Sequence, residues 1–188
     1  LPEQLPSENK GLQPLVQCGG MRAYHITWVT HNSRVSERMV TFGVKRGDSI
    51  LLDNKQEREV ANHIADVISN DKLCVLAFAI CRDHIHMVLV CQPESRDNIV
   101  RKLKGKSTQL YKRAQGITEP YSLWAQKYHY QELVSDIQLS RTLHYVAYNR
   151  QKHSLPFNKG LQPLVDSMLT PLDKAFVLKP NEGTEVAI

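Results

Sequence analysis

Apolar and polar positions along the chain follow two different periods. Segments rich in β-branched and aromatic residues, such as "AYHITWVTH" (23–31), are typical of strands. Between positions 53 and 70, apolar residues instead recur every three or four places, which is the spacing of an amphipathic helix. The whole pattern predicts strands at 23–31, 72–81, 84–92 and 123–134, and helices at 53–70, 94–115 and 136–153.

The order of these elements predicts an α+β fold, in which helices pack on an antiparallel sheet. Only Arg82 and Asp83 separate two of the strands, which favours a hairpin. The segment 36–52 is expected to form one or two short strands or an irregular excursion. A Ser or Asp at 135–136 is a plausible N-cap for the last helix.

The chain of 188 residues has the length of one domain with a hydrophobic core. We expect a compact unit at 21–153 between an N-terminal tail (1–20) and a C-terminal tail (154–188). Little order is expected in the C-terminal tail, which carries prolines at 163, 171 and 180.

The octapeptide "NKGLQPLV" occurs at 9–16 and again at 158–165. Two copies are too few and too widely separated to indicate a solenoid. The simpler interpretation is that both copies are extended surface segments. The alternative is that each copy docks in a similar groove, symmetrically across a dimer.

The composition is that of an ordinary globular protein, with 41% hydrophobic and 23% charged residues. A net charge of +5 favours a polyanionic partner. The four cysteines have no CxxC spacing, which favours a reducing compartment over a disulfide framework. The apolar runs are short and the first residues lack a secretory pattern, so a cytoplasmic protein is expected and no membrane partner.

The segment "HIHMVLVC" places His84 and His86 on one face of a strand. Two hydrogen-bonded histidines lining a partly exposed strand are one interpretation. A divalent metal is the other, because neighbouring neutral imidazoles are good metal ligands. Such a site needs at least one further ligand from elsewhere in the chain.

The helix at 136–153 offers that ligand, since Tyr145 and Asn149 lie one helical turn apart. The amide oxygen of Asn149 suits Mg²⁺ or Mn²⁺, and the Tyr145 hydroxyl would become a nucleophile beside the cation. Tyr145 could instead simply pack the helix. Tyr148 is the rival nucleophile, but its offset of one residue from Asn149 does not stack the two side chains.

The helix at 94–115 is expected to face inward with Ile99, Leu103 and Leu110. Its other positions are strongly basic and could follow a phosphate backbone, although a solvated face is the usual meaning of such a run. The cations are Arg96, Arg101, Lys102, Lys104, Lys106, Lys112 and Arg113. Aromatic residues that could stack on unpaired bases, or pack the core, are Tyr121, Trp124, Tyr128 and Tyr130.

The combination of "HIH", the basic helix and "YVAYN" (145–149) resembles the HUH single-stranded DNA nucleases. Over about 22–153 the chain is most similar to the tyrosine (Y1) transposases of the IS200/IS605 type, in their REP-associated form. Two differences are Asp83, where relatives commonly carry Asn, and Arg150, where they often carry Pro.

This resemblance implies a ferredoxin-like HUH sandwich with the catalytic tyrosine on a C-terminal helix. It implies that His84, His86 and Asn149 hold Mg²⁺ or Mn²⁺ and that Tyr145 is the nucleophile. The basic helix would hold single-stranded or hairpin DNA, which is cut through a 5′-phosphotyrosine and rejoined. A bacterial, nucleoid-associated protein is implied, acting as a monomer or a homodimer.

Competing chemistries are constrained by the same residues. Val88 stands where a histidine-triad hydrolase would need a third histidine, and a two-histidine phosphoesterase would need motifs that are missing. A zinc enzyme using His84 and His86 would not require Tyr145. A transposase-derived protein that binds hairpin DNA without cutting it is the remaining alternative.

Overall fold

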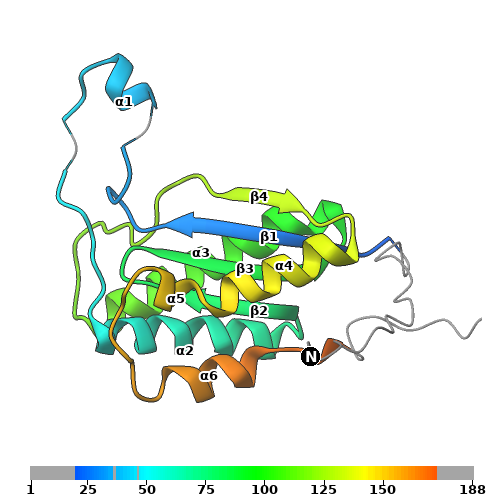
Figure 1. Cartoon of the computed structure of the whole chain (residues 1–188). Helices are drawn as coiled ribbons and strands as arrows, with labels where there is room; N and C mark the ends of the chain where they lie inside the picture. Colours follow the sequence, from blue (N-terminus) through cyan, green and yellow to red (C-terminus); the bar gives the residue numbers. More distant parts are fainter. Residues whose placement is uncertain (1–19, 36, 46, 173–188) are drawn as a thin grey trace, which may run out of the picture.

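The computed structural model describes residues 20–35, 37–45 and 47–172. A four-stranded sheet forms its centre, with every neighbouring pair of strands antiparallel and the order β2-β3-β1-β4 (Figure 1). The strands are β1 (Arg22–Val29), β2 (Cys74–Ile80), β3 (His84–Cys91) and β4 (His129–Glu132). The helices are α1 (Glu37–Thr41), α2 (Asn54–Asn70), α3 (Arg96–Ala114), α4 (Asp136–Ala147), α5 (Asn149–Lys152) and α6 (Leu161–Met168), with a 3₁₀ turn at Pro93–Ser95. The predicted α+β class is confirmed.

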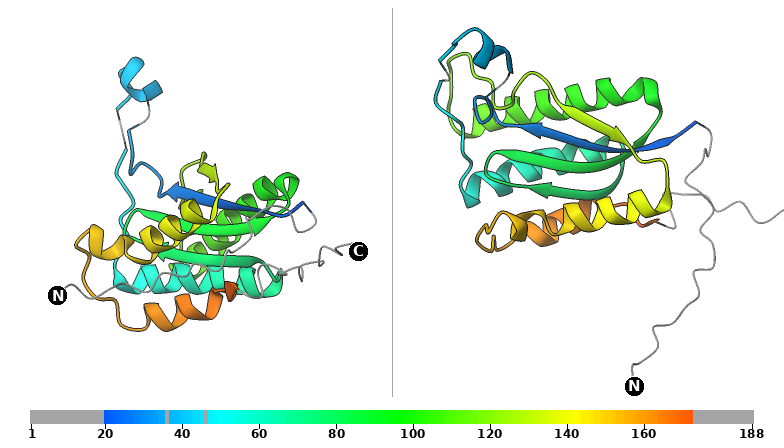
Figure 2. Two further views of the ribbon diagram at one scale, coloured as in Figure 1. Left: turned by 45° about the vertical axis from the view of Figure 1, so that its right-hand side comes forward. Right: turned by 45° about the horizontal axis from the view of Figure 1, so that its top comes forward.

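Helices cover both faces of the sheet (Figures 1 and 2). Helices α2 and α3 pack on one face, while α4 lies across β2 and β3 on the other. Because side chains of a strand alternate between faces, each central strand contributes to two separate cores. On β3, Met87 belongs to the α2/α3 side and Val88 to the α4 side.

The hairpin of β2 and β3 forms as predicted, with Ile80 opposite Ile85. Strand β4 is shorter than the predicted 123–134, because the residues before it take part in side-chain hydrogen bonds in place of regular strand pairing. Trp124 makes only an isolated bridge to Thr30, and its indole donates to Ser107 Oγ. Lys104 donates to the carbonyl oxygens of residues 125–127, which removes them from strand pairing.

The segment 36–52 is an excursion that stands away from the sheet (Figure 1). Among its described residues it contains the short helix α1 and no strand, so of the two expected alternatives the irregular excursion is confirmed and the short strands are not. Backbone hydrogen bonds hold its C-terminal end, since Ile50 donates to His31 and Leu52 donates to Arg82.

Helix α3 faces the core with Leu103, as predicted, but Leu110 does not join the core. Its buried residues form a stripe of Val100, Leu103, Ser107 and Tyr111. Ile99 packs against this stripe at its edge, whereas Leu110 is only partly buried and joins neither core. The Ser107 hydroxyl in this stripe accepts a hydrogen bond from the indole of Trp124.

The single helix predicted at 136–153 is divided in two. Ser135 caps α4, accepting from the Gln138 amide, and α4 ends at Ala147. Tyr148 then departs from helical geometry with φ −97° and ψ 8°, and α5 begins at Asn149. The interruption lets Arg150 donate to the carbonyl oxygen of Ile80 at the end of β2, 2.7 Å away.

The expectation of little order after residue 154 is wrong for α6. Its residues Leu161, Val165 and Met168 are buried in the core that α2 and α3 share with the sheet. The second copy of the octapeptide therefore starts a docked helix, and is not an extended surface segment. The first copy, at 9–16, lies outside the described residues.

Candidate active site

The two histidines of β3 lie on the face of the sheet covered by α4. His84 pairs with Val29 of β1 and His86 with Thr27, and both imidazoles are buried, with 4% and 7% of the residue exposed. Their ring centroids are 5.1 Å apart. The predicted placement on one face is therefore correct, and the site forms where β3 begins.

Both nitrogens of His84 have partners. Nδ1 lies 2.6 Å from Asp83 Oδ1, and Nε2 lies 3.2 Å from the amide oxygen of Asn149. Asn149 is fully buried at the start of α5, and Cys81 Sγ donates to the same amide oxygen over 3.1 Å. Among the described residues, the amide nitrogen of Asn149 is buried without a hydrogen-bond partner.

One nitrogen of His86 is held by β1. Nδ1 lies 2.9 Å from Thr27 Oγ1 and 3.0 Å from His25 Nε2, and the rings of His25 and His86 stack. With a proton on Nδ1, His86 donates to Thr27 and keeps the lone pair on Nε2 for a ligand.

The two imidazoles have opposite proton affinities. Burial alone would lower the pKa of His84, but the hydrogen bonds with Asp83 and Cys81 outweigh it and raise this pKa to about 9. Burial, reinforced by repulsion from His84 and His25, lowers the pKa of His86 to about 3. The Asp83 carboxyl has a lowered pKa, mainly through its hydrogen bond to His84. At neutral pH His86 is therefore neutral, and a cation that binds His84 must displace its proton.

The arrangement fits a divalent cation. His84 Nε2 and Asn149 Oδ1 face each other at 3.2 Å, close to the ~3 Å that separates adjacent ligands of an octahedral ion with bonds of about 2.1 Å. Asp83 and Thr27 orient the two imidazoles through their other nitrogens, as outer partners of metal-binding histidines do. In the described part of the chain, no group of three His, Cys, Asp or Glu side chains could hold a metal ion, and the third group beside the two imidazoles is the amide of Asn149.

Tyr145 reaches this cluster from α4. Its ring centroid lies 5.2 Å from that of His86 and 5.9 Å from that of His25, both edge to face. Tyr148 is 53% exposed and packs against His144, with no ring contact to His84 or His86 among the described residues. Of the two candidate nucleophiles, Tyr145 is the one that faces the histidines.

An open cavity of about 490 Å³ adjoins Tyr145 and His25. Residues of β4 and α4 line the rest of it, including Gln131, Gln138 and Arg141. On another side, Lys152 Nζ lies 4.7 Å from the centre of the Tyr145 ring. A chain with negative charges could therefore reach the tyrosine over a surface that carries two cations.

The basic helix α3 packs on the opposite face of the sheet from Tyr145 (Figure 2). Three of its seven predicted DNA-binding cations have partners outside α3. Arg96 binds Asp97 and stacks on Tyr130, Lys102 pairs with Asp71, and Lys104 donates to backbone carbonyls. The others are Arg101, Lys106, Lys112 and Arg113, of which Arg101 donates only to Asn98 within its own helix.

The four aromatic candidates are divided between the core and the surface. Trp124 is buried edge to face against Trp28, and Tyr121 stacks on Tyr111. Tyr128 hydrogen-bonds Asp97, while Tyr130 is 46% exposed beneath Arg96. Only Tyr130 presents a substantial part of its ring to solvent.

Sequence reasoning missed several residues of the site. His25 and Thr27 could have been found, because alternation along "AYHITWV" places both on one face of a strand. Lys152 could also have been found, because it follows Tyr145 by seven positions, which is two turns of the helix predicted at 136–153. The buried pair of Arg150 with Glu57, 2.9 Å apart, carries no local signal, because 93 positions separate its members.

The histidine pair and the facing tyrosine thus lie together on one face of the sheet of an α+β sandwich. The chain belongs to the IS200-like transposase family, whose model matches residues 22–149. The family identified from "HIH" and "YVAYN" is thereby confirmed. No curated protein matches the chain.

Two solved structures are similar to it. One is a REP-associated tyrosine transposase bound to a REP hairpin, at 14% identity and a TM-score of 0.48, with 98% of this chain and 99% of that chain covered. The other is a candidate transposase from Deinococcus radiodurans R1, at 20% identity and a TM-score of 0.40, covering 76% and 96%. No helix in the described part of the chain is both long and apolar enough to span a bilayer.

Proposed function

We propose that this transposase cuts and rejoins single-stranded DNA near hairpins through a covalent link to Tyr145. The observation that carries the proposal is the convergence of Tyr145, His86 and the His84–Asn149 pair from α4, β3 and α5. A tyrosine that only packed its helix would not need two buried, hydrogen-bonded histidines beside it.

His84, His86 and Asn149 would hold Mg²⁺ or Mn²⁺. The ion would polarise the scissile phosphate and neutralise charge that develops during transfer. Asp83 and Thr27 keep the two imidazoles in the orientation and tautomer that ligation requires. Lys152, whose Nζ lies 4.7 Å from the centre of the tyrosine ring, would add positive charge beside the phosphate under attack.

In the first transfer, a bond forms between Tyr145 Oη and phosphorus while the bond from phosphorus to the 3′ oxygen breaks. The phenolic proton is lost and the departing 3′ oxygen gains one, so a 5′-phosphotyrosine and a free 3′-hydroxyl result. A second 3′-hydroxyl reverses the same exchange and frees Tyr145. One phosphodiester replaces another, so no external energy source is needed.

We propose that the single strand enters along the cavity beside Tyr145, where Arg141 and Lys152 supply positive charge. The exposed cations of α3 would bind duplex phosphates of a hairpin stem that extends to the other side of the molecule. We further propose that this protein acts in the cytoplasm on nucleoid DNA. Whether it acts as a monomer or as a homodimer is left open by this proposal.

The test is covalent trapping. Protein is incubated with a 5′-labelled or 3′-labelled single-stranded hairpin DNA and Mn²⁺, then separated on a denaturing protein gel. We expect an adduct that retains the 3′ label, requires the cation, disappears in Tyr145→Phe and persists in Tyr148→Phe.

The matched tyrosine variants decide the outcome. Loss of the adduct in Tyr148→Phe instead would contradict the assignment of the nucleophile. Tight hairpin binding with no adduct under any divalent cation would support the binder that does not cut. Metal-dependent hydrolysis that survives Tyr145→Phe would support the zinc-type enzyme.

A further inference from the structure

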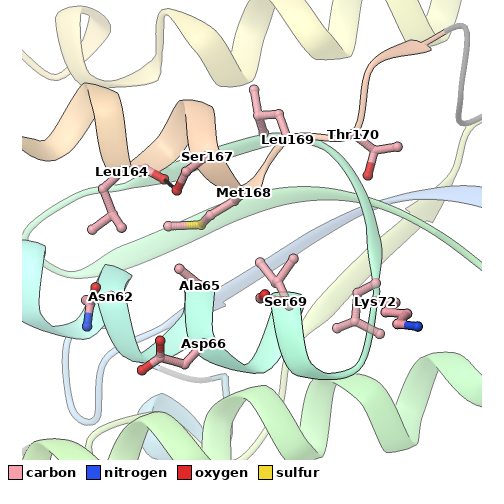
Figure 3. A pocket seen from close by; sticks show the side chains of 12 residues that line it. Asn62, Ala65, Asp66, Ser69, Lys72, Leu164, Ser167, Met168, Leu169 and Thr170 are labelled. Carbon is pink, nitrogen blue, oxygen red and sulfur yellow. Dashed lines mark hydrogen bonds between the residues drawn. The ribbon is translucent and has the colours of Figure 1, made fainter.

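The groove that receives the second octapeptide is formed by α2. Helix α6 lies along α2, with its start beside the first turn of α2 and its end beside β2 (Figure 1). The contact is incomplete, since a cavity of about 580 Å³ remains between the two helices. Figure 3 shows Leu164 and Met168 of α6 across this cavity from Ala65 and Ser69 of α2.

A buried amide anchors the start of the octapeptide. The amide nitrogen of Asn158 donates to the carbonyl oxygen of Asn54 (2.9 Å) and to Glu57 Oε2 (2.8 Å). Its amide oxygen accepts from Arg58 over 2.6 Å. Because Glu57 is fully buried, an occupant of the groove that lacked this amide would leave the carboxylate short of a donor.

Two further positions of the octapeptide have backbone conformations that suit the residues they carry, glycine and proline. Gly160 has φ +85°, a backbone conformation that favours glycine, and its missing side chain leaves room beside Arg58. Pro163 stands in the first turn of α6, where its lack of an N–H costs no hydrogen bond. Leu161 and Val165 then bury their side chains against α2.

The N-terminal copy carries the same residue at each of these positions. Asn9, Gly11, Leu12, Pro14 and Val16 correspond to Asn158, Gly160, Leu161, Pro163 and Val165. The match ends after Val16, so that Gly19 stands where the docked copy buries Met168. The first copy thus has the features that the groove selects, but lacks the last apolar anchor.

The connection to the sheet allows the first copy to reach the groove of its own chain. Docked in the same direction, Val16 would lie towards the end of the sheet at which both β1 and β2 begin, where Thr170 now donates to Val75. Residues 17–21 then lead to β1 and span ~17 Å when extended. Strand β1 is two places from β2 in the sheet, a separation of about 10 Å.

We propose that residues 9–16 bind the α2 groove of the same chain in exchange with residues 158–165. The groove has one site and two ligands of nearly identical sequence. The copy that ends with Met168 occupies it most of the time. The N-terminal copy replaces it in a minor state, in which Asn9 supplies the donor to Glu57.

Disulfide trapping in the full chain tests the exchange. In the shared register, the native Cys18 takes the place of Ser167, which lines the cavity together with Ala65. In an Ala65→Cys variant we expect a disulfide between Cys18 and position 65 within single chains, detected by peptide mass spectrometry and a non-reducing gel. Cys18→Ser is the background control.

Matched asparagine variants show whether the two copies compete. Asn9→Ala in the Ala65→Cys background should reduce trapping about tenfold, because the buried Glu57 then loses one of its two donors in the minor state and keeps only Arg150. Asn158→Ala should increase trapping severalfold, because it weakens the resident copy. Thermal unfolding of the Asn9→Ala chain should match that of its parent.

Three results would overturn the proposal. One is trapping that is insensitive to Asn9→Ala, which would indicate random collision of Cys18. Another is trapping unchanged by Asn158→Ala, which would show that the copies do not share the groove. The last is a disulfide found only between two chains, which would mean that the segment docks on a second copy.

Discussion

The two faces of the sheet are built from different kinds of residue, although the same strands supply both. The α2/α3 face contains large side chains that are almost fully buried, among them Trp28, Met87 and Leu89. The α4 face contains small residues such as Ala77 and Ala79, together with the imidazoles of β3. One face therefore provides most of the apolar burial, and the other holds the candidate chemistry.

The small residues explain why polar groups can be buried on the α4 side. Alanine leaves room for α4 to approach the sheet and for the ring of Tyr145 to meet His86. The imidazoles are tolerated there because Thr27, Asp83 and Asn149 pair with three of their four nitrogens. The large apolar face fixes the strands, so that this hydrogen-bonded set keeps its geometry.

Neighbouring residues of β3 provide the strongest test of this contrast. Met87→Ala should lower the free energy of unfolding by about 2–5 kcal/mol, because it opens a cavity in the α2/α3 core. His86→Ala should cost clearly less stability yet abolish the adduct with hairpin DNA. Chemical denaturation and the trapping gel measure the two effects, and an equal loss of stability in both variants would contradict the division.

Arg150 connects the two faces around the edge of the sheet. It follows Asn149 in α5 and donates to Glu57 of α2 (2.9 Å), with 19% of its side chain exposed and none of that of Glu57. Arg150→Ala should destabilise the fold by about 3 kcal/mol, because a buried carboxylate loses its counterion.

Arg22→Ala is the matched control for that prediction. Arg22 pairs with Glu132 at the surface, and its removal should cost no more than about 1 kcal/mol. Denaturation midpoints compare the two variants. Equal costs would show that the buried pair does not join the faces.

Asp83 sharpens the comparison within the site itself. Asp83→Asn removes the carboxylate that orients His84 and should reduce Mn²⁺ affinity by about 10–100-fold, with little change in stability. Isothermal titration with Mn²⁺ measures the change. Arg34→Ala, which removes only the exposed partner of Asp83, should leave the affinity within a few-fold of the parent.

The smallest effects are expected from surface cations on either face. Arg141→Ala should weaken binding of a short single strand and reduce its salt slope by about 0.7 per lost phosphate contact. Arg101→Ala, on the other face, should affect only DNA with a hairpin stem. Fluorescence anisotropy at several salt concentrations compares them, and a loss of short-strand binding in Arg101→Ala would contradict the proposed path.

Much of the site could be predicted because its signals are local. Strand alternation places His84 and His86 on one face without any knowledge of the fold, and the spacing of "YVAYN" links Tyr145 to Asn149. The expectation of a continuous helix was nevertheless wrong. The chain leaves helical geometry at Tyr148, next to the point where Arg150 contacts residues that are distant in the sequence, and no local pattern indicates this.

The sequence by itself determined which segments have strand and helix periods. It also placed His84 and His86 on one face of a strand, indicated Tyr145 as a candidate nucleophile and identified the family. These follow from residues within a few positions of one another, where backbone geometry alone fixes which side chains share a face. Tertiary structure decided which cations remain free, how α3 lies relative to Tyr145, and where the octapeptide docks. Those outcomes depend on pairings across long stretches of chain, such as Glu57 with Arg150 and Asn158, for which no local pattern exists.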